Sequence, residues 1–361
     1  MKESSKGKKI IKTVLIIFCV IILLAGGGFL ALAATEFRPE DEAGLSAYGT
    51  MSKELNPGDT ISVMTWNIGY AGLGEEEDFF MDGGKRSRPD SVEEVTANLE
   101  GIENFILEQN PDIAFFQEVD ADSSRSYYID ETKQIESVTP DYVHSFAQNF
   151  KVAFLPYPIP PMGKIDSGIQ TVSRYGVTEA WRYQLPIPFT WPVRAFNLKR
   201  CLMLERIPIA GSDKELVLVN LHLEAYDSGE GKIAQTKALT DILEAEYEKG
   251  NYVIAGGDFN QTFSSVDLSR FPVLSEDYWA PGIIEESDFA DHWQLLMDDS
   301  EPSCRSLDKP YVAGSDPKEF QHYVIDGFIV SDNIEVEDLS TINLGFKNSD
   351  HNPVTMQVTL K

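Results

Sequence analysis

A run of uncharged residues from Thr13 to Thr35 constrains this chain more than any other feature. Five lysines and one glutamate precede it: Lys2, Glu3, Lys6, Lys8, Lys9 and Lys12. As a helix, the run is about 34 Å long at about 1.5 Å per residue, which is enough to cross a bilayer. Lysines beside a span stay on the cytoplasmic side. We therefore expect residues 1–35 to anchor the chain in a membrane, with everything after them outside the cytoplasm.

A cleaved signal peptide is the alternative for the same segment. Val14 to Leu24 forms a compact apolar core, and Ala31-Leu32-Ala33 fits a cleavage site made of small residues. The protein would then be secreted instead of anchored. Both alternatives place the rest of the chain outside the cytoplasm.

The charge of the chain bears on its partners. The first twelve residues carry four net positive charges, so the remainder carries −32 against −28 for the whole chain. An acidic body repels polyanions at long range, and this disfavours a nucleic-acid binder that relies on a basic groove. Cys201 and Cys304 are far apart in the sequence, and the sequence does not decide whether they form a disulfide. We expect a monomer.

The body shows two strand-helix-strand patterns. A strand over 61–67, apolar helix positions from Val92 to Ile106 and a buried strand from Ile113 to Phe116 form the first. The second consists of a strand over 216–221, a helix containing Leu239 and Leu243, and a strand over 252–255. Residues 36–60 contain little apolar periodicity and are expected to be a juxtamembrane linker. The sequence predicts one α/β domain over 61–361.

Five short segments place carboxylates, carboxamides and histidines at expected strand ends. They are Trp66-Asn67, Gln117-Glu118, Asn220-Leu221-His222, Gly257-Asp258-Phe259-Asn260 and Ser349-Asp350-His351. Side chains at strand ends next to glycine can converge on a cleft. Each segment alone is weak evidence, because Asp-x-Asn is most often a turn.

Together these segments resemble the endonuclease/exonuclease/phosphatase superfamily, which includes deoxyribonucleases, apurinic endonucleases, neutral sphingomyelinases and inositol polyphosphate phosphatases. The motifs that carry the resemblance occur in order: TWNIG at 65–69, QEVD at 117–120, SRY at 173–175, NLHLE at 220–224, GDFN at 257–260, IDGF at 325–328 and SDHNP at 349–353. The resemblance implies a four-layer α-β-β-α sandwich. It also implies a Mg²⁺-dependent phosphoesterase, with Mn²⁺ as the alternative ion.

The resemblance assigns a role to each residue. A hard divalent cation on carboxylate oxygens neutralises charge on a phosphoryl group, and Asn67, Glu118 and Asp350 are the implied metal residues. Asp258 is the implied general base. Donors to the phosphoryl oxygens are His222 and Asn260. The remaining implied catalytic residues are His351, Asp326 as its carboxylate partner, and Arg174 beside the phosphate.

Two apolar, proline-rich segments, 153–162 and 185–196, flank Arg174 in the sequence. If exposed, they would form an apolar surface beside the active site that favours lipid phosphoesters. The alternative is that they pack on each other or on a sheet edge.

The sequence therefore supports an extracytoplasmic hydrolase of lipid or small-molecule phosphoesters. An extracellular nuclease is the alternative within enzymes. A non-catalytic binding module on the same fold is the alternative outside them, and substitution of the metal carboxylates or histidines would be its signature.

Overall fold

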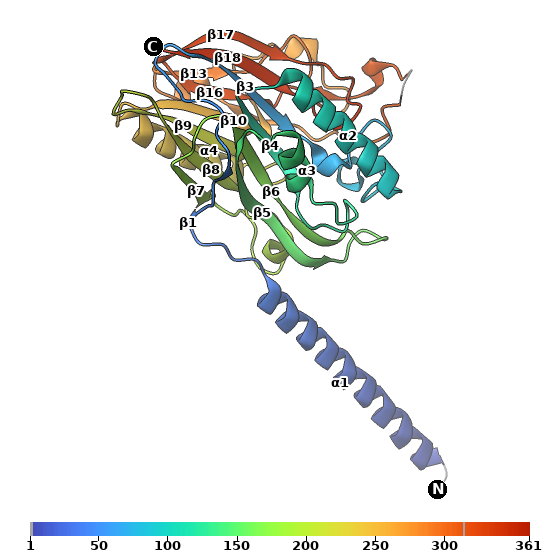
Figure 1. Ribbon diagram of the computed structural model, residues 1–361. Coiled ribbons are helices and arrows are strands. Elements are labelled where there is room, and N and C mark those ends of the chain that lie inside the picture. Colours follow the sequence, from blue (N-terminus) through green and yellow to red (C-terminus); the bar gives the residue numbers. More distant parts are fainter. Residues whose placement is uncertain (1–2, 313–314) are drawn as a thin grey trace.

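The computed structural model describes residues 3–312 and 315–361. Helix α1 (Glu3–Thr35) projects from the body as a single rod (Figure 1). Its segment Lys8–Thr35 has a mean hydropathy of 2.9 and no part of it is buried in the body. A transmembrane anchor and a signal sequence both have these properties.

The body contains two seven-stranded sheets. The first has the order β17-β18-β3-β4-β6-β5-β2, from β17 (Ile334–Thr341), β18 (Val354–Leu360), β3 (Thr60–Asn67), β4 (Ile113–Asp120), β6 (Gly163–Ser173), β5 (Val143–Leu155) and β2 (Tyr48–Gly49). The second has the order β1-β7-β8-β9-β10-β16-β13, from β1 (Glu42–Gly44), β7 (Glu179–Gln184), β8 (Cys201–Pro208), β9 (Glu215–His222), β10 (Tyr252–Asp258), β16 (Asp326–Ser331) and β13 (Trp293–Leu296).

Three apolar cores join four layers. Between the sheets, Phe115 of β4 packs in one cluster with Leu218 of β9 and Phe328 of β16. Helices α2 (Val92–Gln109) and α3 (Glu131–Val138) cover the outer face of the first sheet, and α4 (Glu230–Tyr247) covers that of the second. The predicted four-layer α-β-β-α sandwich is confirmed.

Both predicted strand-helix-strand units are present, and both pair their strands in parallel: β3 with β4, and β9 with β10. The Ser91 hydroxyl caps α2 by accepting from the Glu94 N–H, and Asn110 ends that helix in a left-handed conformation. Parallel pairing brings the carboxyl ends of neighbouring strands to one edge of each sheet.

Residues 36–60 differ from the expected linker. β1 pairs with β7 and β2 pairs with β5, so the segment contributes an edge strand to each sheet, and Leu55 is buried between the sheets. Edge pairing needs only backbone N–H and C=O groups, which leave no apolar periodicity in the sequence.

Small elements complete the body. β11 (Gln261–Phe263) pairs with β12 (Gly282–Ile284), and β14 (Cys304–Arg305) pairs with β15 (His322–Tyr323). Cys201 and Cys304 are both buried and unbonded. The disulfide that the sequence left open is therefore not present in this structure.

Candidate active site

The carboxyl ends of four strands from both sheets meet at one cavity. Asn67 and Glu118 come from β3 and β4 of the first sheet, while His222 and Asp258 end β9 and β10 of the second. Asp258 is in register with His222 on one side and with Asp326 of β16 on the other. The cavity has a volume of about 440 Å³, and six of the predicted residues line it: Glu118, His222, Asp258, Asn260, Asp350 and His351.

A β-bulge directs Glu118 into the cavity. The register between β4 and β6 shifts between Phe116 and Val119, and Glu118 has a φ of +54°. A left-handed backbone is costly for a residue with a side chain. Asn260 shares this feature with a φ of +50°. Strained residues therefore occupy two of the predicted site positions.

Asn67 does not line the cavity itself but connects two carboxylates that do. Its Nδ2 donates to Asp258 Oδ2 at 3.0 Å and to Glu118 Oε1 at 3.3 Å, while its Oδ1 accepts from the Gly69 N–H at 3.0 Å. In this arrangement Asn67 orients two carboxylates. Its role as a metal ligand stays a prediction.

Asp258 is suited to exchange a proton near neutral pH. Burial raises its pKa to about 7, with a further contribution from the negative charge of Asp326, while His351 opposes the shift. Its Oδ1 accepts from the Asn260 N–H at 2.8 Å, and Oδ2 faces His222 Nε2 at 3.4 Å. A carboxylate with this pKa can act as a general base.

The two histidines are held in opposite protonation states. Burial lowers the pKa of His222 well below its usual value, and the positive charges of Arg200 and His351 add to the effect. Burial alone would also lower the pKa of His351, but the carboxylates of Asp326 and Asp350 outweigh it and hold that pKa well above the usual value. The site thus contains a neutral imidazole and an imidazolium.

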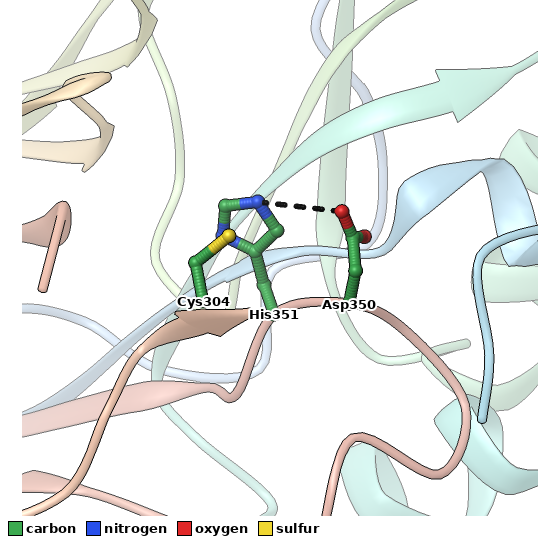
Figure 2. A group of neighbouring side chains, drawn as sticks. All are labelled: Cys304, Asp350 and His351. Atoms are coloured by element: carbon green, nitrogen blue, oxygen red, sulfur yellow. Dashed lines mark ion pairs between the residues drawn. The ribbon is translucent and has the colours of Figure 1, made fainter. Parts of the chain in front are cut away.

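Asp350, His351 and Cys304 form a compact buried group (Figure 2). Their candidate ligand atoms lie within 4.8 Å of one another, and His351 Nε2 is 4.0 Å from Asp350 Oδ2. Burial raises the pKa of the Cys304 thiol to about 12, so the sulfur stays protonated and is a poor ligand for a hard cation. The Cys304 sulfur of this group therefore does not fit Mg²⁺.

The oxygen donors Glu118 and Asp350 do fit a hard cation. Burial raises the pKa of Asp350 to about 6, and the negative charge of Glu118 adds to the shift. A divalent cation beside both carboxylates would relieve this repulsion. Their role as metal ligands, like that of Asn67, stays a prediction.

Arg174 is not brought to the site, which corrects the prediction from the SRY segment. It follows β6, and its N–H donates to the carbonyl of Asp112, before the start of β4. Glu118 lies six residues further along, about 20 Å away at roughly 3.3 Å per residue. The Arg174 guanidinium instead donates to the Tyr142 hydroxyl at 2.8 Å and to Asn110. The strand direction, which the motif order does not reveal, sends it to the opposite end of the sheet.

Arg200 is a residue that the sequence reasoning missed. It immediately precedes β8, is 4% exposed and lines the cavity. Nη1 donates to the His222 carbonyl at 3.2 Å, whereas Nε lies 3.4 Å from Glu224 Oε2 without hydrogen-bond geometry. A buried guanidinium with a free donor suits a phosphoryl oxygen. The only signal in the sequence was a basic residue directly before the strand that pairs with the strand ending at His222.

Apolar side chains line the other half of the cavity. They come from three segments distant in sequence: Phe79, Phe80, Phe150, Leu155, Met162, Phe196 and Leu198. The predicted apolar segments 153–162 and 185–196 therefore do reach the cavity. They do so at the end of the sheet opposite Arg174. The expectation rested on their flanking Arg174 in the sequence, and that reason was therefore wrong.

A model of the endonuclease/exonuclease/phosphatase family matches residues 64–351. Among solved structures, the endonuclease/exonuclease/phosphatase from Beutenbergia cavernae superposes with a TM-score of 0.57 at 18% identity, covering 83% of this chain and 72% of that one. No curated protein matches the chain.

Two further structures share the fold. The human Nocturnin catalytic domain with bound sulfate gives a TM-score of 0.51 at 16% identity, over 88% of this chain and 98% of that chain. D. rerio TDP2 in complex with a single-strand DNA product gives 0.51 at 12% identity, over 83% and 99%. At such identities these likenesses establish the fold alone.

Proposed function

The chain belongs to the endonuclease/exonuclease/phosphatase family, whose members are hydrolases of phosphate esters, and we propose that it is a Mg²⁺-dependent phosphoesterase acting outside the cytoplasm. The observation that carries this proposal is the convergence of Glu118, Asp258 and His351 on one cavity from both sheets and a loop. The predicted carboxylates Glu118, Asp258 and Asp350 and both predicted histidines line the cavity, which argues against a binding module without catalysis.

The residues divide the chemistry between them. Asp258 accepts the proton of the attacking water, while Asn67 holds its carboxylate in place. His222, Asn260 and Arg200 offer donors around the phosphoryl oxygens. Glu118 and Asp350 would hold Mg²⁺, which would neutralise charge on the phosphoryl group.

His351 is the group that places positive charge beside the reacting phosphate. Its Nδ1 donates to Asp326 at 2.8 Å, so Nε2 carries the proton that faces the cavity. It can donate that proton to the leaving oxygen or to a phosphoryl oxygen.

An extracytoplasmic location is supported by the N-terminal lysines and by α1. A nuclease remains the alternative, because D. rerio TDP2, which shares this fold, is in complex with a single-strand DNA product. The charge of −28 for the whole chain disfavours it, since nucleic-acid binding needs a cationic surface.

The experiment is a substrate panel on the full-length protein in detergent, with Mg²⁺ and with chelator. The panel contains bis(p-nitrophenyl) phosphate, a phosphomonoester, phosphatidylcholine and single-stranded DNA. Asp258→Asn is the inactive control, because an amide cannot accept the proton. Hydrolysis that needs Mg²⁺ and Asp258 supports the proposal, and preferential DNA cleavage at physiological salt would support the nuclease. Substrate binding without turnover would indicate the binding module.

A further inference from the structure

The apolar side of the cavity lies next to the end of α1. The ring of Trp191, in the loop 185–196, lies 5.5 Å from the ring of Phe29 in α1. In the same loop Arg194 Nε donates to Glu36 Oε1 at 2.8 Å. Figure 1 shows α1 leaving the body beside the lower ends of β5 and β6. The anchor is therefore fixed to the segment that borders the cavity.

The position of Phe29 sets the level of this contact in a membrane. Phe29 lies six residues before the end of α1 at Thr35, about 9 Å along the axis at about 1.5 Å per residue. If α1 spans a bilayer with Thr35 at its outer surface, Trp191 beside Phe29 would lie near the boundary between headgroups and acyl chains, where tryptophan is enriched.

Exposed apolar residues extend from this contact along the mouth of the cavity. They are Phe154 near the end of β5, Tyr157 and Ile159 from the turn between β5 and β6, and Trp191 and Val193 from the loop. We call these five residues the apolar rim. Ile159 is 91% exposed. The two segments belong together, because Leu155 and Phe196 pack in one apolar cluster with Met162.

We propose that the apolar rim rests on the outer leaflet of the bilayer that α1 spans, and that the cavity takes its phosphoester from that leaflet. The substrate class is an amphiphile with a phosphate ester headgroup. Its phosphate would reach Asp258 and His351, and its apolar part would contact side chains such as Phe80, Phe150 and Leu155. The choice of substrate rests on the proposed function, whereas the contact with the bilayer does not.

A bilayer fits the rim better than the other occupants. A cluster of exposed apolar side chains of this kind marks an interaction surface. The anchor holds the rim at the membrane permanently, so contact needs no further association step. The acidic body favours zwitterionic over anionic lipid. A second copy of the chain is the competing occupant.

The contact is tested by placing a fluorophore at Ile159. Ile159→Cys, in a Cys19→Ser background, is labelled with NBD in the full-length protein and reconstituted in phosphatidylcholine bilayers. Cys201 and Cys304 are buried and do not compete for the label. Leu107→Cys is the matched control, because Leu107 is 55% exposed on α2 near the end of the sheet that holds Arg174.

We expect doxyl-labelled phosphatidylcholine to quench the label at position 159 and not the label at 107. Equal, weak quenching at both positions would overturn the proposal. A blue shift at 159 that depends on the protein-to-lipid ratio and is insensitive to doxyl lipid would assign the rim to a second copy.

A second experiment tests the substrate class. The variant Phe154→Ser, Ile159→Ser, Val193→Ser changes only rim residues that do not line the cavity. We expect kcat/KM on phosphatidylcholine bilayers to fall about tenfold or more, with turnover of bis(p-nitrophenyl) phosphate unchanged. Equal loss on both substrates, or no loss on either, would refute uptake from the leaflet. If no phosphoester is hydrolysed even by wild type, the proposed function fails, and the quenching result still decides whether the rim contacts the bilayer.

Discussion

His351 donates through Nδ1 to Oδ2 of Asp326 at 2.8 Å, and both side chains are buried. Ser303 Oγ donates to the same carboxylate oxygen at 2.7 Å, so Asp326 is fixed from two sides. This contact determines which ring nitrogen faces the cavity. It also favours the charged imidazolium, because the carboxylate raises the pKa of His351 against the effect of burial.

Asp326→Asn should therefore reduce kcat by about 100-fold. The amide keeps the shape but not the charge that stabilises the imidazolium. Asp338→Asn, on the exposed side of β17, is the control and should leave kcat unchanged. Steady-state kinetics measure kcat for both variants, and equal melting temperatures show that both are folded. Wild-type kcat for Asp326→Asn would remove the pair from the mechanism.

Removal of metal should abolish turnover, and Mg²⁺ should restore it. Glu118→Gln should raise the Mg²⁺ concentration needed for half-maximal activity by roughly tenfold or more, because an amide lacks the charge that binds a hard cation. A Mg²⁺ titration of bis(p-nitrophenyl) phosphate hydrolysis measures this. Full activity in excess chelator would contradict the metal assignment.

The two arginines give a direct test of the structure against the sequence. Arg200→Ala should lower kcat/KM by about 100-fold, since it removes a buried donor from the cavity. Arg174→Ala should stay within about twofold of wild type, because Arg174 lies about 20 Å away by strand geometry. The opposite ranking would show that the SRY segment, not Arg200, serves the phosphate.

Glu205 makes stability depend on pH. It lies on β8 at 1% exposure, and burial raises its pKa to about 7, while the hydroxyls of Ser145 and Thr171 partly oppose the shift. The folded state thus keeps a proton that the unfolded chain releases above its ordinary pKa of about 4.5. The resulting penalty is absent below that value and grows as pH rises towards 7, to about 3 kcal/mol at most.

Glu205→Gln should consequently stabilise the protein at pH 8, and the gain should shrink markedly at pH 5. Urea unfolding at both pH values measures it, with Glu335→Gln on exposed β17 as the control. A gain of the same size at both pH values would show that ionisation of Glu205 is not its source.

Topology is tested by protease treatment of intact cells. We expect the body to be digested and a short fragment carrying the N-terminus to remain protected, because the lysines before α1 stay in the cytoplasm. Release of the whole body into the medium without protease would indicate signal cleavage. A body protected in intact cells and digested only after lysis would contradict the orientation.

The sequence by itself predicted the two strand-helix-strand units, whereas the family resemblance implied the four layers and the roles of the site residues. Alternating and helical apolar periods are local, so β3, α2 and β4 could be read directly from residues 61–116. Glu118, His222 and Asp258 were found because each follows a recognisable strand, and the ends of parallel strands meet by geometry.

Tertiary structure alone decided which groups with no local signature join the site. The SRY segment favoured Arg174 over Arg200, but β6 runs antiparallel to β4 and carries Arg174 away. Arg200 directly precedes β8, whose start meets the end of β9 at His222. The edge strands in 36–60 and the contact of Phe29 with Trp191 were likewise invisible. Both depend on long-range pairing, in which backbone groups and surfaces distant in the chain meet only after the sheets have formed.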